Sequence, residues 1–274
     1  MKIHANVQVK NEEILLNEIY NIWKDYPVDK WVFYNDNSTD QTEDFIKGAF
    51  GDKAVIINDN LPRFHESHQR SRMLEYSREE GADFAIAIDC DELMSTHMLE
   101  NIEDLLISNK QYDIQYYWFN VVGSLNKIRQ DNAYRNNYRT FVMPIAKTGQ
   151  FNKDLWKYHT PRTPPIDLQK VYCEDAGFIH LQSVNVKFYA LKQLWYKHHE
   201  FHKYGHTVAE INNRYDPVVN NLNFEEIDTP PNVVDGISFN ISIFDDICES
   251  KGYKKYIEDN YIEDLITFGR EYLV

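Results

Sequence analysis

The chain has 274 residues, which suits one large α/β domain or a domain with an appendage. Hydrophobic residues make up 43% of it, while glycine and proline number only 10 and 9, so collagen-like and low-complexity classes are excluded. The formal net charge of −14 argues against nucleic acids and anionic membranes as partners, because both bind basic surfaces.

The first third of the chain alternates strand and helix patterns. Ser38 and Gln41 have the spacing of a capping box, and Gly81 is a natural helix stop. Repeats of this kind predict an α/β fold with a doubly wound, mostly parallel sheet and helices on both faces. In chain order, we expect a strand at 3–9, a helix at 11–26, a strand at 31–34, a helix at 38–50, a strand at 54–57, a helix at 65–81 and a strand at 84–88.

The pattern changes after about residue 110. We assign residues 1–185 to the core domain and 186–274 to a helical C-terminal region. Further along the chain, we expect a helix at 92–109, an aromatic strand at 112–122, strands at 138–146 and 177–182, a helix at 187–214 and more helices at 237–274.

Polar residues follow three of the expected strands, at Lys10-Asn11-Glu12, Asn35-Asp36-Asn37 and Asp89–Glu92. Ligands of doubly wound sheets bind beyond the carboxyl ends of the strands, so these clusters are candidates for one site. Asp36 could bind a base or a ribose there, or could act only as a turn residue.

Asp89-Cys90-Asp91 is the strongest candidate for chemistry. A buried apolar strand that ends in carboxylates needs something to neutralise their charge, and hard oxygen ligands favour Mg²⁺ or Mn²⁺. The alternative is an acidic turn that caps the helix at 92–109. Arg63, Arg70 and Arg72 lie just upstream, and one of them could contact a diphosphate rather than solvent.

Four ordered motifs in the first 95 residues resemble family 2-like glycosyltransferases of the GT-A fold. They are Asn11-Glu12-Glu13, Asn35 to Thr42, Arg70, and Gly81 to Glu92. The family's usual Asp-Asp-Gly-Ser stands here as Asn35-Asp36-Asn37-Ser38, and the Gln/Arg-x-x-Arg-Trp motif of processive membrane synthases is absent. A soluble enzyme that adds a single sugar is therefore the better match.

The resemblance implies a UDP-sugar donor, a glycan or other hydroxyl acceptor, and Mn²⁺ or Mg²⁺. Asp36 would contact the base and Val9 would line its pocket, and Asn11 and Glu13 would also bind the nucleotide-sugar. Arg70 would lie near the base or the diphosphate. For the metal, it implies Asp91 as the direct ligand, Asp89 on the ribose or on metal-bound water, and a later histidine, His180, in the metal shell.

Other candidates have strong alternatives. Glu174 and Asp175 are the nearest candidates for a catalytic base, or a solvated acidic turn, and His180 could instead be a core histidine. His198, His202 and His206 fall on one helix face that could bind a metal, although such a face is more often polar surface. Trp118, Trp156 and Trp195 could stack on an acceptor sugar, although the core is the more usual place for each.

The sequence therefore predicts a metal-dependent glycosyltransferase. The rivals are a non-catalytic carbohydrate- or nucleotide-binding module, a sugar-nucleotide pyrophosphorylase and a phosphatase. A pyrophosphorylase would need a glycine-rich loop after the first strand, where this chain has Val9 to Glu12. Neither an apolar leader nor a run of about 18 apolar residues is present, so we expect a cytoplasmic protein with no membrane span.

Overall fold

The computed structural model describes residues 1–59, 61, 65–131, 134–152, 160–219 and 224–259. The chain forms two compact units, each built from three segments. The expected boundary at 185/186 falls close to the passage from His180 in unit 1 to Leu181 in unit 2, but each unit also contains segments from elsewhere. Unit 1 comprises Met1–Phe119, Asn136–His180 and Pro230–Phe239, and unit 2 comprises Asn120–Arg135, Leu181–Thr229 and Asn240–Val274.

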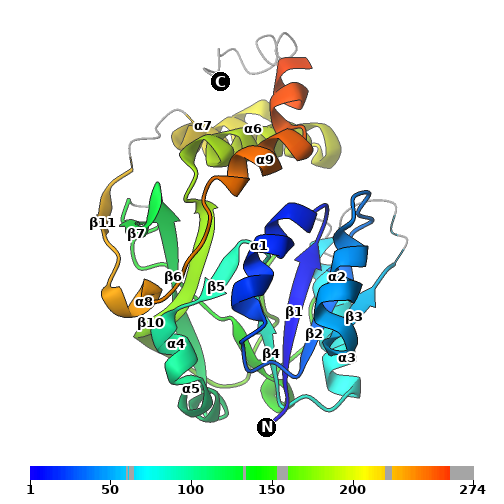
Figure 1. Cartoon of the computed structure of the whole chain (residues 1–274), viewed down its shortest axis with the longest axis vertical. Coiled ribbons are helices and arrows are strands. Elements are labelled where there is room, and N and C mark those ends of the chain that lie inside the picture. The colour runs from blue at the N-terminus through cyan, green and yellow to red at the C-terminus, as the bar shows by residue number, and fades with distance from the viewer. Residues whose placement is uncertain (60, 62–64, 132–133, 153–159, 220–223, 260–274) are drawn as a thin grey trace. The chain divides into compact units, whose positions relative to one another are not determined.

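Unit 1 contains a five-stranded sheet with the order β3-β2-β1-β4-β9 (Figure 1). The pairs β1–β2, β2–β3 and β1–β4 are parallel, and β9 is antiparallel to β4. The four strands expected in the first third of the chain are therefore confirmed. The members are β1 Ile3–Val9, β2 Lys30–Asn35, β3 Ala54–Ile57, β4 Phe84–Ala87 and β9 Val142–Pro144.

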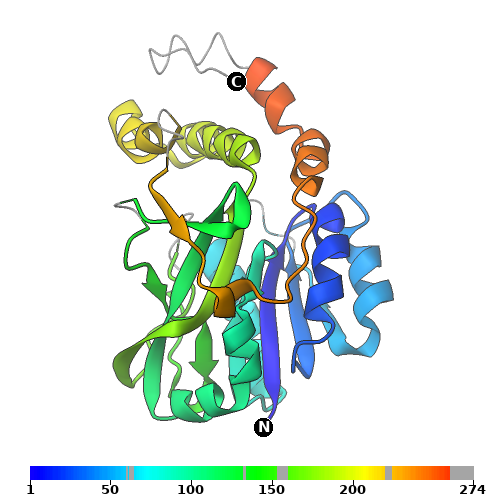
Figure 2. The ribbon, with the colours of Figure 1, turned by 60° about the vertical axis from the view of Figure 1, so that its left-hand side comes forward.

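Three helices cover the two faces of this sheet: α1 (Glu13–Trp23), α2 (Thr42–Phe50) and α3 (Glu66–Glu79). Side chains of β2 alternate between the faces, as the strand period requires. Trp31 stacks on Trp23 of α1 with ring centroids 4.8 Å apart, whereas the next residue, Val32, packs with Met73 of α3. Figures 1 and 2 show α1 and α2 side by side on the face opposite α3, so the doubly wound arrangement is confirmed.

Two local expectations are wrong. Ser38 does not cap α2, because its Oγ accepts a hydrogen bond from the backbone N–H of Asn11 at 2.9 Å and the helix begins later, at Thr42. The expected helix at 92–109 is instead a short strand and two short helices. These are β5 Glu92–Met94, which pairs antiparallel with β10, α4 Thr96–Glu100, which Ser95 caps, and α5 Ile102–Asn109.

A second sheet has the order β11-β7-β6-β10-β5, and β8 pairs with β6. Its long strands, β6 (Tyr112–Val122) and β10 (Gln169–Ser183), begin in unit 1 and end in unit 2, while β8 (Tyr138–Arg139) belongs to unit 1. β10 passes so close to β6 at Gly177 that a Cβ there would lie 2.0 Å from the carbonyl oxygen of Tyr117. Only glycine fits this crossing.

Among its described residues, unit 2 contains the helices α6, α7 and α9 and the strands β7 and β11. The expected helix at 187–214 is interrupted by Gly205, which has a φ of 68° and ends α6. Within the unit, Lys197 of α6 is fully buried and its Nζ lies 2.6 Å from Oδ1 of Asp216 on α7. The remaining elements are β7 Ser124–Arg129, α6 Val186–Tyr204, α7 Val208–Val219, β11 Glu226–Asp228 and α9 Ile243–Ser250, with α8 Pro231–Val234 in unit 1.

Across the described part of the chain, no helix combines the length and the apolar character needed to cross a bilayer.

Candidate functional site

Asp36 follows the last residue of β2 and is buried in a polar network. Its Oδ2 accepts a hydrogen bond from Nζ of Lys10 at 2.8 Å, and its Oδ1 accepts one from Nε2 of Gln69 on α3 at 3.1 Å. Gln8 of β1 in turn donates to Oε1 of Gln69 at 2.6 Å. These bonds fix the orientation of the carboxylate at the carboxyl end of the sheet. Val9, also buried, supports it through its carbonyl, which accepts the backbone N–H of Asp36 at 2.9 Å.

Asn11 and Glu13 connect the loop after β1 to the loop after β2. Oδ1 of Asn11 accepts the backbone N–H of Thr39 at 2.7 Å, and Oε2 of Glu13 accepts that of Gln41 at 3.3 Å. Asn11 itself has a φ of 53°, a left-handed conformation that asparagine tolerates better than most residues. Both side chains therefore hold two strand-end loops together beside Asp36.

The Asp89–Glu92 segment is a tight turn at the end of β4. The backbone N–H of Asp89 donates to Oε2 of Glu92 at 2.8 Å, and the N–H of Glu92 donates back to the carbonyl of Asp89 at 3.0 Å. Nε1 of Trp23 also donates to the carbonyl of Glu92 at 3.1 Å, which fastens the turn to α1. The side chain of Glu92 is fully buried, whereas that of Asp89 is 37% exposed.

Arg162 neutralises part of this acidic turn. Its Nη1 and Nη2 reach the two carboxylate oxygens of Glu92 at 2.6 and 2.8 Å, and Nη2 also reaches Oδ2 of Asp89 at 2.9 Å. The guanidinium lies 4.7 Å from the ring centre of Phe141 and 5.5 Å from that of Trp118. Burial raises the pKa of Glu92 to about 7, while the charge of Arg162 opposes this rise.

His180 stands beside Asp91. It pairs with Glu92 across the antiparallel strands β10 and β5, and its Nε2 lies 3.6 Å from Oδ2 of Asp91. Trp118 of β6 stacks on the imidazole with ring centroids 4.4 Å apart. Both His180 and Asp91 are buried. The structure thus brings together two of the three residues predicted to bind a metal, while Asp89 is engaged by Arg162.

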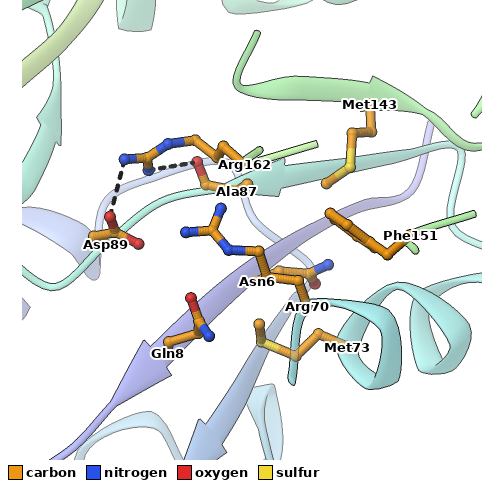
Figure 3. A pocket seen from close by; sticks show the side chains of 9 residues that line it. All are labelled: Asn6, Gln8, Arg70, Met73, Ala87, Asp89, Met143, Phe151 and Arg162. Atoms are coloured by element: carbon orange, nitrogen blue, oxygen red, sulfur yellow. Dashed lines mark hydrogen bonds and ion pairs between the residues drawn. The ribbon is translucent and has the colours of Figure 1, made fainter. Parts of the chain in front are cut away.

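A pocket opens between β1, β4 and α3, next to this cluster (Figure 3). Figure 3 shows the guanidinium groups of Arg162 and Arg70 pointing toward the side of the pocket where Asp89 and Gln8 lie. Arg70 is buried and paired with Glu66, and its Nε has no hydrogen-bond partner among the described residues. Arg70 therefore lines this pocket with a buried N–H that has no hydrogen-bond partner among the described residues.

The other arginines near α3 do not share this pocket. Arg72 pairs instead with Asp59, with its Nε 3.0 Å from Oδ2, and Arg63 lies outside the described residues. A second pocket, of about 670 Å³, also borders Arg162 and is lined largely by hydroxyl, amide and proline side chains.

Glu174 and Asp175 lie elsewhere. Both are exposed on β10, six and five residues before His180, which corresponds to roughly 16–20 Å along an extended strand. The structure does not bring either side chain to the Asp91–His180 pair, and their assignment as the catalytic base stays a prediction.

The three residues predicted to bind a metal, Asp89, Asp91 and His180, all lie at this acidic turn or beside it. Among the described residues, no group of three or more His, Cys, Asp or Glu side chains is gathered closely enough to hold a metal ion. Asp91 and His180 nevertheless place an oxygen and a nitrogen donor side by side, with Asp89 close in sequence. Carboxylate oxygens with one imidazole suit Mn²⁺ or Mg²⁺. Such an ion would also need an oxygen of Asp89, whose Oδ2 lies 2.9 Å from Nη2 of Arg162.

The predicted histidine face and the predicted tryptophan platform are not formed as single surfaces by the described residues. His198 is buried in α6, while the side chain of His206 is 31% exposed, so the predicted histidine face is not one continuous surface. Trp195 stacks on His199 in unit 2, and Trp156 lies outside the described residues.

The sequence did not predict that Arg162 pairs with Glu92. The acidic turn signalled that a buried cation must exist, because buried carboxylates need a counter-charge. Nothing in the sequence shows which distant arginine supplies it, since Arg162 lies in a proline-rich segment far along the chain.

No protein-family model matches this sequence, and no curated protein matches it. Among solved structures, TarS from S. aureus is similar with a TM-score of 0.50 and 13% identity, over 71% of this chain and 40% of that chain. A shorter TarS chain in complex with UDP has a TM-score of 0.47 and 14% identity, over 71% of this chain and 66% of that chain. Glucosyl-3-phosphoglycerate synthase from Mycobacterium tuberculosis, crystallised with Mn²⁺, UDP and glucosyl-3-phosphoglycerate, has a TM-score of 0.33 and 18% identity, over 43% and 44%.

The chain thus spans less than half of the full TarS chain. At this level of identity the similarity shows the fold alone: a mixed α/β fold of the GT-A glycosyltransferase type.

Proposed function

We propose that this chain is a glycosyltransferase that moves a sugar from a nucleoside diphosphate sugar, a UDP-sugar, to an acceptor hydroxyl. The observation that supports this proposal is that Asp36 follows β2, while Asp89 and Asp91 follow β4, at the carboxyl ends of the two parallel strands that flank β1 in a GT-A-type sheet. In doubly wound sheets this edge is where ligands bind.

We assign Asp91, Asp89 and His180 as the residues that would hold a divalent cation. The chemistry that such a cation supplies when bound is neutralisation of the negative charge that develops on the departing diphosphate. Asp36 would orient the base, because Lys10 and Gln69 already fix its carboxylate. Arg70 would donate its buried Nε–H toward the phosphates.

The acceptor hydroxyl must lose a proton during an inverting reaction, and Glu174 and Asp175 remain the proposed bases for that step. Both side chains are exposed on β10, so an acceptor in solution can reach them. A retaining reaction would need neither residue, and variants of both therefore separate the two stereochemical courses.

The decisive test is a panel of nucleotide-sugars incubated with the protein and Mn²⁺ or Mg²⁺, with detection of free nucleoside diphosphate and of transferred sugar. Slow hydrolysis of one donor, abolished by Asp91→Asn, is the result expected of a transferase. Tight binding of a donor with no turnover under any condition would support a non-catalytic binding module instead. A protein that neither binds nor turns over any donor contradicts both readings.

A further inference from the structure

Arg162 is held in place from several sides. The backbone N–H of Thr160, two residues earlier, donates to Oε2 of the buried Glu66 on α3 at 2.8 Å. The guanidinium then packs beside the rings of Phe141 and Trp118, 4.7 and 5.5 Å from their centres, and reaches Glu92 through both of its terminal nitrogens. A two-pronged arginine contact of this kind fixes direction as well as charge. Arg162 is therefore a largely buried residue whose packing and hydrogen bonds fix it against the acidic turn.

The two carboxylates that Arg162 contacts differ in what they can do. Glu92 is fully buried and is also bonded to the backbone N–H of Asp89, so it faces inward as a structural anchor. Asp89 is 37% exposed, and only its Oδ2 is in contact with Arg162, at 2.9 Å. Asp89 is thus the carboxylate that could leave Arg162 and turn toward an incoming cation.

The charges around Arg162 also bear on how a cation would bind to Asp89. Arg162 contacts two carboxylates, those of Asp89 and Glu92, and a third, that of Asp91, lies two residues from Asp89. The positive charge of Arg162 lies 2.9 Å from Oδ2 of Asp89, so it repels any cation that approaches this oxygen. A diphosphate adds negative charge beside the same cluster and offsets that repulsion.

We propose that Arg162 is a positioning residue that competes with the divalent cation for Asp89, so that the cation binds tightly only together with a nucleotide diphosphate. Without nucleotide, Arg162 holds Asp89 and keeps cation affinity low. With nucleotide, the phosphates are an alternative acceptor for the Nη2 of Arg162, and Asp89 becomes available as a ligand. The proposal makes binding of the two ligands mutually dependent by the same factor.

The test is the affinity of the protein for Mn²⁺ alone, measured from the electron paramagnetic resonance signal of free Mn²⁺. Arg162→Gln should bind Mn²⁺ at least about tenfold more tightly than the wild type, because a unit charge a few ångströms from the ion is removed. Arg135→Gln is the matched control: Arg135 is 53% exposed, pairs with one carboxylate, Glu225, and its loss changes the net charge equally. It should leave Mn²⁺ affinity unchanged.

A second variant covers the case in which Arg162→Gln fails to fold, since Glu92 would then be buried without a counter-charge. The double variant Glu92→Gln/Arg162→Gln keeps the net charge of the cluster and vacates Oδ2 of Asp89. It should still bind Mn²⁺ several-fold more tightly than the wild type. Affinity equal to or weaker than that of the wild type, in whichever of these variants folds, overturns the proposal.

The inference rests on the proposed function only in that nucleotide and cation share one site. Addition of UDP should tighten Mn²⁺ binding to the wild type by about tenfold or more, and by clearly less in Arg162→Gln. If Mn²⁺ affinity rises in the variant but UDP has no effect on either protein, Arg162 competes for Asp89 as proposed and the nucleotide-sugar function fails. The two conclusions are therefore separable.

Discussion

The Nε2 atom of His180 lies 3.6 Å from Oδ2 of Asp91, although the two residues come from distant parts of the chain. Backbone pairing of β10 with β5 sets His180 opposite Glu92, and the ring of Trp118 supports the imidazole from one side. The two donors are thus held near one another by strand pairing and packing. A site assembled in this way loses little conformational entropy when a ligand arrives.

Replacing His180 by alanine should weaken Mn²⁺ binding and Mn²⁺-supported donor hydrolysis by at least about tenfold, the scale seen for residues that support metal sites. The apo protein should remain folded by circular dichroism. His206→Ala is the control, because its side chain is 31% exposed and lies in unit 2. If His180→Ala unfolds by itself, His180 is primarily a core residue that packs against Trp118.

Asp91→Asn should reduce donor hydrolysis at least about a hundredfold, since it removes the charge that a metal-assisted step requires. The apo melting temperature should stay level or rise, because one of several neighbouring carboxylates is neutralised. Asp228→Asn provides the comparison, as its carboxylate is 88% exposed and pairs only with Lys127 on the surface of unit 2. Equal turnover by wild type and Asp91→Asn would mean that the active site lies elsewhere.

Asp36→Asn should lower nucleotide affinity by a few-fold to about a hundredfold, the range of one or two lost hydrogen bonds. Asparagine is chosen because its amide oxygen can still accept the bond from Gln69, so the apo stability should change little. Calorimetric titration of UDP measures the effect, with Asp83→Asn, before β4 at the opposite end of the sheet, as control. Unchanged affinity would make Asp36 a turn residue only.

Glu92→Ala should lower the free energy of unfolding by about 3–5 kcal/mol, because it leaves Arg162 buried beside a cavity. Glu258→Ala removes the exposed helical partner of Lys254, with side chains 60% and 59% exposed, and should lower it much less. Urea unfolding of both variants measures the contrast. A similar small loss in both would show that water reaches the Glu92–Arg162 pair and screens it.

Gly177→Ala should destabilise the fold by about 1–3 kcal/mol, since its Cβ would overlap the carbonyl of Tyr117 and push β10 away from β6. Gly48→Ala meets no atom within 4 Å and lies inside α2, so it should be stabilising by roughly 0.5–1 kcal/mol. Thermal unfolding of the two variants compares them directly. Equal melting temperatures would contradict the close crossing at Gly177.

Much of the sheet could be predicted from the sequence because its strands have local signatures. The run from Phe84 to Ala87 is apolar at every position, which is typical of a strand covered on both faces, and β1 alternates apolar with polar residues. The strand β5 could not be predicted in this way. Glu92 to Met94 reads as the start of a helix, and only pairing with the distant β10 makes it a strand.

In the candidate site, too, the residues that follow strands could be predicted, whereas those placed by long-range contacts could not. Asp36, Asp89 and Asp91 follow strands directly, so the edge they share follows from topology alone. Ser38 looked like a helix cap, yet the neighbouring loop needed its hydroxyl for Asn11. Arg162 lies 73 residues after Asp89 in the sequence, and no local sequence pattern predicts that the two side chains meet.

The chain crosses between its two units repeatedly, and unit 1 is completed only by residues 230–239. That last piece includes α8, and the carbonyl of Asp235 just after it accepts a hydrogen bond from Oγ1 of Thr96 on α4 at 2.7 Å. During synthesis the ribosome releases the acidic turn and α4 long before this closing piece. Unit 1 therefore cannot reach its full set of native contacts as a nascent N-terminal fragment. For the same reason, a proteolytic cut near residue 185 should leave two fragments that stay associated rather than an independent domain.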